Sequence, residues 1–371
     1  MNILVIGNGF DLAHNLPTQY SEFLCFIKAI ANPGNSCYSS FINEIKENRQ
    51  VLFSEIQTLM SSNKLLDYFL SIYEERCKVG KDGWIDFEHE ISIIVQKFDE
   101  AKQILLEKIN GPTGEAIISN NELLLYLKPL IASEQTPLSE LRRSKFRPSF
   151  FDEQARSYYD SLNHLIRLLE IYLFEYVGNL KIDFRLPELQ KLTIDHVLIF
   201  NYTETYKKLY DPDTKAQYCY VHGKAQNCDE ASCNLVLGID EYLPPDRIDV
   251  DNQFVWCKKF YQRIYKQTGS EYIDWVNQQN RSIKGESFNV YIYGHSLDIT
   301  DKDILSKLIL THNAKIYIYY HNRKAMANQI NNLIKLIGEE TLIKMTGGKN
   351  RSISFIQSQP ALTLKEQENN E

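Results

Sequence analysis

The sequence predicts an α/β fold that combines a parallel sheet with a large all-helical insertion. Short runs of apolar, mostly β-branched residues are typical of strands that are buried on both faces, as they are in parallel sheets. Helical patterns follow some of these runs, which favours alternating strands and helices. Between residues 38 and 189 the strand signals nearly vanish and long helical patterns replace them. These three observations define the fold class.

Strands are expected at six places along the chain. They are residues 3–6, 196–200, 218–221, 235–237, 290–293 and 316–320. A helix is expected over residues 18–30 and another over residues 300–310, where Thr300 is a candidate N-cap with Asp303 three positions later. Within the insertion, helices are expected over residues 68–76, 87–109 and 153–177.

We expect the chain to divide into three parts. Residues 1–37 and 190–358 form the sheet domain, and residues 38–189 form the helical insertion that interrupts it. Residues 359–371 end in a polar stretch and are expected to be a disordered tail. A length of 371 residues agrees with more than one structural unit, since a domain has roughly 150 residues.

The composition is that of an ordinary globular protein, and it excludes several classes. The net charge of -7 disfavours a nucleic-acid partner, because neutralising phosphates requires a basic surface. No window approaches the ~20 apolar residues of a membrane helix, and we expect neither a secretory signal nor a membrane partner. Seven scattered cysteines are expected to be free thiols in a reducing cytoplasm. No metal site is expected, because Cys228 and Cys233 have no second pair at zinc spacing.

The first candidate site is the Gly7-Asn8-Gly9 turn, which follows the first expected strand. Glycines permit positive φ and let a ligand approach the backbone, and a helix that starts nearby offers N–H groups to phosphates. The alternative is a tight turn with a purely structural role. Phe10 and Asp11 complete the motif. The Asp11 carboxylate would repel a pyrophosphate unless it faces a ribose hydroxyl or caps a helix.

The second and third candidates stand at the ends of two later strands. Asn201 can donate and accept hydrogen bonds at once, which suits a ribose or a water held in place. The alternative is that Asn201 is a turn residue and Thr203 a helix cap. His222 lies at a strand exit, where an ordinary pKa of ~6.5 suits proton transfer. His196 lies inside its apolar run, and we assign it no role.

The fourth candidate is the stretch Gly294-His295-Ser296-Leu297, with Asp301 beyond it. A hydroxyl and backbone amides at this strand end would cradle a ribose or a phosphate. The alternative is a turn that leads into the next helix.

A fifth stretch lies in the insertion, from Trp84 to Glu90, and contains an acidic cluster at an expected helix start. One interpretation is that these carboxylates complement the dipole of that helix. The other is that Glu88 reaches into the candidate site.

Together these stretches resemble the AbiH family of bacterial abortive-infection proteins. The resemblance rests on Gly7-Asn8-Gly9-Phe10-Asp11, Leu16-Pro17-Thr18 with Tyr20, Phe200-Asn201-Tyr202-Thr203, His222-Gly223, and Gly294-His295-Ser296-Leu297 with Asp301. The stretch from Trp84 to Glu88 looks like a further family element. The similarity spans the whole chain, and it implies a role in antiphage defence.

The same order of motifs is similar to a distant version of the Rossmann-like, sirtuin-type NAD-binding fold. This resemblance implies that Asn201 and His222 are catalytic, with Glu88 and Asp301 as accessory residues. The cofactor-binding residues that it implies are Gly7, Asn8, Gly9, Phe10, Asp11, Thr203, Gly294, His295, Ser296 and Leu297. The chain lacks the paired Cys-x-x-Cys zinc elements of deacetylating sirtuins, which disfavours protein deacylation, and Asp11 stands where those proteins usually have serine.

The function implied by the resemblance is hydrolysis of NAD, as the substrate, to nicotinamide and ADP-ribose during phage infection. His222 would act as a general base, a role typically worth ~10²–10⁴-fold in rate. Two alternatives stay open, namely a nucleotide sensor without enzymatic activity and a nuclease or other toxin that acts through the insertion. We expect a homo-oligomer formed through the aromatic helical part, and a phage-derived trigger or partner protein is a candidate regulator.

Overall fold

The computed structural model describes residues 1–32, 34, 36–80, 85–107, 148–227, 229–244, 247–248, 252–281, 287–359 and 362–363. Its centre is a six-stranded sheet in which every pair of neighbouring strands is parallel. The strands are β1 (Asn2–Ile6), β3 (His196–Ile199), β4 (Gln217–Tyr220), β5 (Phe288–Tyr293), β6 (Ala314–Tyr320) and β7 (Ile353–Gln357). The predicted α/β fold with a parallel sheet is therefore confirmed.

The order of strands across the sheet is β4-β3-β1-β5-β6-β7. After β1 the chain builds the sheet outward in one direction through β3 and β4. It then returns to the other side of β1 and adds β5, β6 and β7. In sheets of this doubly wound, Rossmann-like order, ligands bind beyond the carboxyl ends of the strands where the direction reverses. In this protein that position lies between β1 and β5.

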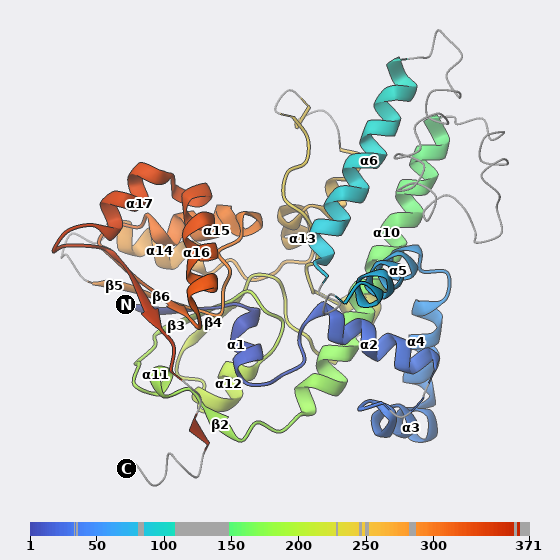
Figure 1. Ribbon diagram of the computed structural model, residues 1–371, viewed down its shortest axis with the longest axis horizontal. Coiled ribbons are helices and arrows are strands. Elements are labelled where there is room, and N and C mark those ends of the chain that lie inside the picture. The colour runs from blue at the N-terminus through green and yellow to red at the C-terminus, as the bar shows by residue number, and fades with distance from the viewer. Residues whose placement is uncertain are drawn as a thin grey trace.

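Alternate residues of β1 face opposite sides of the sheet, which explains its continuous apolar sequence. Ile3 and Val5 pack in a cluster with the helices above the sheet in Figure 1, whereas Leu4 and Ile6 pack with those below it. The upper helices are α14 (Tyr272–Arg281), α15 (Lys302–Ile309), α16 (Arg323–Ile337) and α17 (Glu339–Thr346). The lower helices are α1 (Asn8–Ala13), α11 (Pro187–Gln190) and α12 (Thr205–Tyr210). Since both faces are covered, the strands can be apolar throughout.

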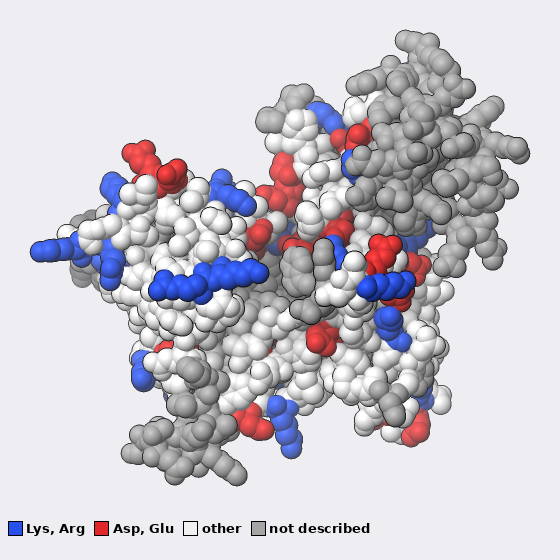
Figure 2. Space-filling view, in the orientation of Figure 1, with Lys and Arg blue, Asp and Glu red and all other residues white. Residues whose placement is uncertain are grey.

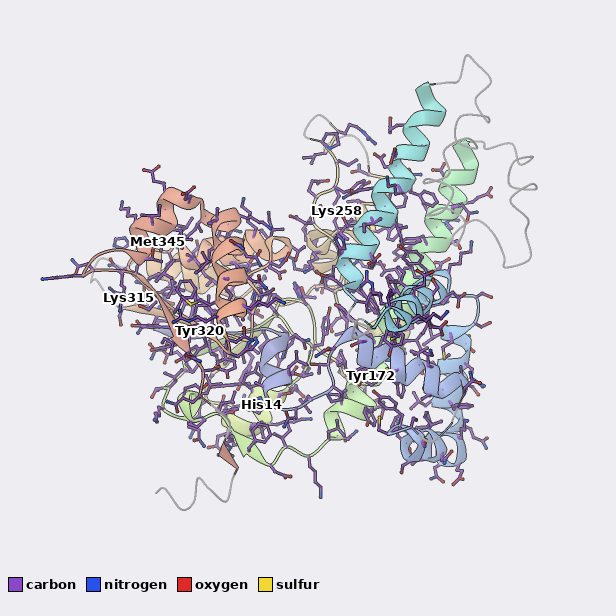
Figure 3. The ribbon with its side chains drawn as sticks, in the orientation of Figure 1. His14, Tyr172, Lys258, Lys315, Tyr320 and Met345 are labelled. Atoms are coloured by element: carbon purple, nitrogen blue, oxygen red, sulfur yellow. The ribbon has the colours of Figure 1, made fainter. Side chains whose placement is uncertain are left out.

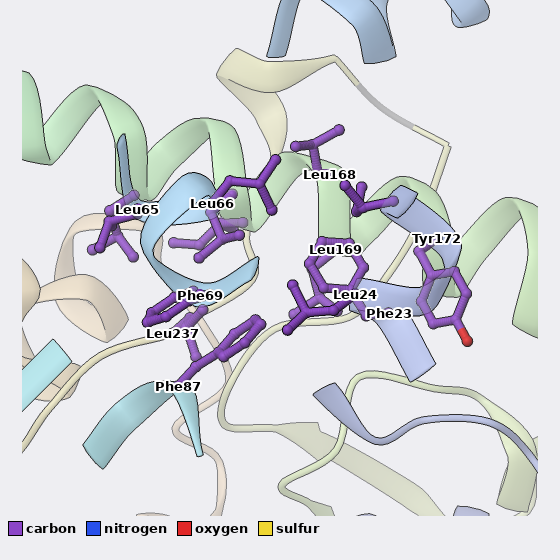
Figure 4. Close-up of a cluster of buried hydrophobic side chains, with 14 of the residues drawn as sticks. Phe23, Leu24, Leu65, Leu66, Phe69, Phe87, Leu168, Leu169, Tyr172 and Leu237 are labelled. Atoms are coloured by element: carbon purple, nitrogen blue, oxygen red, sulfur yellow. The ribbon is translucent and has the colours of Figure 1, made fainter. Parts of the chain in front are cut away.

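A second, all-helical part lies beside the sheet domain, at the right in Figure 1. Its helices are α2 (Tyr20–Ala31), α3 (Ser39–Asn48), α4 (Gln50–Met60), α5 (Lys64–Lys78), α6 (Phe87–Glu107) and α10 (Pro148–Ile171). They share one large apolar cluster, part of which Figure 4 shows around Phe69 and Phe87. Phe23 and Leu24 of α2 belong to the same cluster, so this core begins before residue 38.

Two contacts tie the helical part to its surroundings. The hydroxyl of Tyr172, which follows α10, donates a hydrogen bond to the carbonyl of Pro17 in the loop after α1. In Figure 3 Tyr172 lies in the helical part and His14 in the sheet domain. Lys258, which precedes the short helix α13 (Lys259–Tyr265), lies between the two parts in the same view. The second contact is made by Lys259, whose Nζ lies 2.9 Å from Glu88 of α6 and 3.2 Å from Asp301 of the sheet domain.

The structure differs from the predicted strands at four places. Residues 235–237 form no strand, because side-chain and loop contacts replace ladder partners: the N–H of Leu237 donates to Oε1 of Gln262, and that of Val236 to the carbonyl of His222. Strand β7 was not predicted. Leu362 and Thr363, predicted to be in a disordered tail, form β8. β8 pairs with β2 (Phe184–Arg185), a strand that was not predicted because it lies in the expected all-helical insertion.

Several other predictions concern the helices, termini and cysteines. Five expected helices correspond to α2, α5, α6, α10 and α15, with bounds that shift by a few residues. Four parts of these predictions lie outside the described residues: residues 108–109, Trp84, Cys228, and 360–361 with 364–371 of the expected tail. All six cysteines that the structure describes are free thiols. In the described part of the chain, no helix has the length and apolar character that a membrane span requires.

Candidate functional site

The two glycine motifs meet at the carboxyl ends of β1 and β5. The N–H of Gly9 donates to the carbonyl of Gly294 at 2.8 Å. Gly294 has φ +67°, and a Cβ at this position would lie 2.1 Å from the backbone nitrogen of Phe10. A Cβ on Gly7 would lie 2.7 Å from the Gly294 carbonyl oxygen. The close approach that requires these glycines is therefore the contact between the two loops, while their contact with a nucleotide stays a prediction.

A pocket of about 1040 Å³ opens at this point, between the sheet domain and the helical part. We call it the switch-point pocket. Acidic side chains gather around the hollow between the two parts in Figure 2. The predicted site residues that line it are Gly7, Asn8, Gly9, Asp11, Glu88, Asn201, Thr203, His222, Gly294, His295, Ser296 and Asp301. Phe10 and Leu297 are fully buried in the apolar clusters on opposite faces of the sheet and do not line the pocket.

The Asp11 carboxylate makes its hydrogen bonds with Asn201 and Thr203 and does not face an open part of the pocket. Its carboxylate accepts hydrogen bonds from Nδ2 of Asn201 at 2.7 Å and from the hydroxyl of Thr203 at 2.7 and 2.9 Å. Asp11 is fully buried, and burial raises its pKa to about 6, although hydrogen bonds from Thr205, Thr203 and Asn201 oppose the rise. Thr203 is no helix cap, because α12 is preceded by Glu204 and has no side-chain cap.

The contact with Asp11 fixes the orientation of the Asn201 amide. Because Nδ2 donates to a carboxylate, the other end of the amide presents Oδ1, which can only accept. This oxygen is buried and has no hydrogen-bond partner among the described residues. A buried acceptor without a partner costs roughly 1–3 kcal/mol, so Oδ1 favours a bound donor.

His222 presents a second buried acceptor in the same pocket. Its Nδ1 donates to the carbonyl of Phe200 at 3.1 Å, which leaves Nε2 as the acceptor of the neutral ring. Nε2 lies 3.0 Å from Oδ1 of Asp301, with which it can pair only when the ring is protonated. In the neutral ring Nε2 has no hydrogen-bond partner among the described residues. Burial lowers the pKa of His222, Asp301 opposes this effect, and Lys259 adds to it. The ring is therefore neutral at pH 7 and can accept a proton.

Asp301 is the centre of a buried charge network formed by Glu88, Lys259, Asp301, His222 and His295. Its Oδ1 lies 3.2 Å from Nζ of Lys259, and its Oδ2 lies 3.7 Å from Nε2 of His295. Burial opposes ionisation of Asp301, but Lys259 and His222 hold its pKa well below the usual range. Burial lowers the pKa of His295 to about 4, so this ring is neutral as well. The network holds one fixed negative charge beside two neutral imidazoles.

The helical part contributes Glu88 to this network. Its Oε2 lies 2.9 Å from Nζ of Lys259, and burial raises the pKa of Glu88 to about 7 against the opposing effect of Lys259. The side chain of Glu88 remains 20% exposed. Burial opposes the charge on Lys259 as well, but Asp301 and Glu88 outweigh it and raise the pKa of Lys259. Glu88 therefore reaches the site, as one of the two interpretations of the sequence expected.

Two residues differ from the sequence-based expectations. Thr300 is no side-chain N-cap: Asp298 accepts from its backbone N–H, and its hydroxyl instead accepts from Nζ of Lys259 at 3.1 Å. Lys259 was not predicted at all. It lies in no glycine motif and at no strand end, and the sequence around it carries no signal beyond an ordinary Lys-Lys pair.

These features define the class of the protein. It is a doubly wound α/β protein with a polar pocket at the switch point of its sheet, and a helical part forms one side of that pocket. Residues 3–321 match the family described as Bacteriophage abortive infection AbiH, and the chain belongs to this family. Membership supports a role in abortive infection of bacteriophage. No curated protein and no solved structure matches the chain, so its similarity to sirtuin-type domains stays a prediction.

Proposed function

We propose that this AbiH-family protein binds NAD in the switch-point pocket and hydrolyses the bond between nicotinamide and ribose. One observation carries the proposal. Asn201 and His222 both line the pocket, and each has a buried acceptor atom without a hydrogen-bond partner among the described residues. Two acceptors call for a ligand with two donors, and the hydroxyls of a ribose are such a pair.

The size of the pocket agrees with an extended ligand. At about 1040 Å³ it matches the upper end of the range of roughly 300–1,000 Å³ found for ligand pockets. The pocket lies at the sheet position where Rossmann-like folds bind dinucleotides. A dinucleotide is therefore a better candidate than a small metabolite.

The charge of the lining favours one end of NAD. Asp11, Asp86, Glu88, Asp240, Glu241, Asp298 and Asp301 line the pocket. Among the described residues that line the pocket, Lys259 is the one Lys or Arg. Negative charge stabilises the cationic nicotinamide ring and an oxocarbenium-like ribose, and it disfavours pyrophosphate. We expect the pyrophosphate at the loops of Gly7–Gly9 and Gly294–Ser296, where backbone groups line the pocket.

The chemistry requires one water and no other reactant. The bond between ribose C1′ and the nicotinamide nitrogen breaks, nicotinamide leaves as a neutral molecule with the bonding electrons, and water adds to C1′ of the oxocarbenium-like ribose. Nε2 of neutral His222 accepts the proton that the water or a ribose hydroxyl gives up. Asn201 holds that hydroxyl or water through Oδ1. The products are nicotinamide, ADP-ribose and a proton.

The test combines binding and turnover. Calorimetry measures NAD affinity, and nicotinamide release is followed for the purified protein alone and with lysate from phage-infected cells. We expect Asn201→Ala and His222→Ala to reduce release at least ~100-fold, and the exposed His312→Ala control to leave it unchanged. Equal release by wild type and His222→Ala would refute the assignment.

A nucleotide sensor remains the second candidate, and the same two acceptors favour it. They would hold a ribose diol whether or not a bond is broken. Tight NAD binding that is lost in Asn201→Ala, without nicotinamide release under any of these conditions, would identify a sensor. An absence of both binding and release would refute both candidates.

A further inference from the structure

Lys259 is the residue of the pocket whose role neither the motifs nor the proposed function explains. It is 3% exposed, and it begins helix α13. Nζ lies within hydrogen-bond distance of three oxygens, from Glu88 at 2.9 Å, Thr300 at 3.1 Å and Asp301 at 3.2 Å. An ammonium group has three N–H donors, so these oxygens use all of them. Lys259 has no donor left for a ligand phosphate, and its role is toward the protein.

We propose that Lys259 is a positioning residue, which holds the Asp301 carboxylate against His222 and couples the catalytic histidine to Glu88 of the helical part. The proposal rests on the proposed function only for the catalytic role of His222. The four residues come from separate segments: Glu88 from α6, Lys259 from α13, Asp301 from the 3-10 turn before α15, and His222 from the end of β4.

The geometry makes Asp301 the shared element. Its Oδ1 contacts both Nζ of Lys259 and Nε2 of His222, at 3.2 and 3.0 Å. The protonation of the Asp301 carboxylate therefore depends on the charge of Lys259 and on the charge of His222. A positive charge at Lys259 favours the ionised carboxylate and disfavours a proton on the neighbouring imidazole. Loss of that charge makes the pair of Asp301 and His222 take up a proton at higher pH.

The charged and titratable groups that face His222 are few in the described part of the chain. Asp301 favours its protonation, whereas Lys259 and Arg263 of α13 disfavour it. His295, which follows β5, interacts with His222 and with Asp301. Glu88 acts through Lys259, whose charge it partly compensates. Arg263 is paired with Asp303, whereas Nζ of Lys259 lies 3.2 Å from Oδ1 of Asp301, so Lys259 is the cation whose removal alters the pair most directly.

The experiment follows the ring of His222 by NMR in the full-length protein with isotope-labelled histidine, without NAD. The His222→Ala variant assigns the signal, and its titration senses protonation of either Asp301 or His222. We expect Lys259→Met to raise the midpoint by about one pH unit or more. Lys259→Arg keeps the charge and should keep the wild-type midpoint. A merely structural lysine would give no such difference between the two variants.

Two outcomes would overturn the proposal. In the first, Lys259→Met has the same midpoint as wild type, or the His222 ring stays unprotonated in both proteins. In the second, Lys259→Arg raises the midpoint as much as Lys259→Met does. If Lys259→Met fails to fold, the double variant Glu88→Gln/Lys259→Met removes both partners of the ion pair. Its midpoint should still rise, but by less, because Glu88 partly compensates the charge of Lys259. The titration contains no NAD. Its failure is therefore distinct from a failure of NAD hydrolysis, which nicotinamide release measures.

Discussion

Nδ2 of Asn201 donates to Oδ2 of Asp11 at 2.7 Å, across 190 positions of sequence. This contact joins helix α1 to the loop that follows β3. It also decides what the pocket offers a ligand, because the amide that binds Asp11 through its nitrogen must present its oxygen elsewhere. We therefore expect Asp11 to act on a ligand through Asn201.

We predict that Asp11→Asn weakens NAD binding by roughly tenfold, the effect of losing about one hydrogen bond. An amide at position 11 no longer dictates the orientation of Asn201, so Oδ1 is no longer directed to the ligand. Calorimetry at pH 7.5 measures the affinity. Asp213→Asn is the matched control, since Asp213 lies on the surface in an exposed ion pair. Wild-type affinity in Asp11→Asn would contradict the prediction.

The raised pKa of Asp11 predicts a pH-dependent stability. The folded protein binds the proton up to about pH 6, whereas the unfolded chain releases it near 3.8. The stability from this group is therefore full below pH 3.8 and is lost as the pH rises to about 6. With about 1.4 kcal/mol for each pH unit, the loss approaches 3 kcal/mol.

Urea unfolding of wild type and Asp11→Asn between pH 4 and 7 measures this loss. We expect the stability of wild type to fall relative to the variant as the pH rises through this window. Histidines such as His295 give the opposite slope, because a lowered pKa makes stability rise with pH between about 4 and 6.5. These histidines are present in wild type and in Asp11→Asn, so their effects cancel in the difference between the two free energies of unfolding. A difference that does not vary with pH would contradict the prediction.

Most of the pocket residues that the sequence predicted are carried by strand ends, whereas Glu88 was predicted from an acidic cluster at a helix start. Gly7, Asn201, His222 and Gly294 each follow an apolar run, and parallel strands bring their carboxyl ends to one edge. Lys259 could not be predicted in this way. Its position depends on the packing of α13 between the sheet domain and the helical part, a long-range arrangement that leaves no local pattern.

In the fold, too, local sequence patterns predicted some elements, whereas others depend on long-range packing. Continuous apolar runs identified five of the six strands of the main sheet. A strand was wrongly predicted at residues 235–237 because an apolar run can also result from burial without strand pairing. Here Leu235 and Leu237 pack in the helical core, and a side chain accepts the hydrogen bond of the Leu237 N–H. Strand β7 was missed because its sequence, Ile-Ser-Phe-Ile-Gln, interrupts the apolar run at an edge strand.

Gly294→Ala tests the contact between the two glycine loops. Alanine at φ +67° costs about 1–2 kcal/mol for the backbone alone, and its Cβ would meet the Phe10 nitrogen at 2.1 Å. We expect a total loss of roughly 4 kcal/mol or more. Gly348→Ala is the control, because Gly348 has φ +74° but no atom within 4 Å of the added Cβ. Equal losses in the two variants, measured by urea unfolding, would show that the loops can separate without cost.

The last prediction concerns Phe87, which connects the helical core to the charge network. Phe87 is fully buried, its ring is stacked between Tyr20 at 4.2 Å and Phe69 at 4.3 Å, and the next residue is Glu88. We expect Phe87→Ala to cost about 3–5 kcal/mol in urea unfolding, because it leaves a cavity between two rings. Val51→Ala, at a residue that is 87% exposed in the same part, should change stability by less than about 0.5 kcal/mol. A cost for Phe87→Ala no larger than that of Val51→Ala would mean that the stack does not hold the start of α6, and with it Glu88, against Lys259.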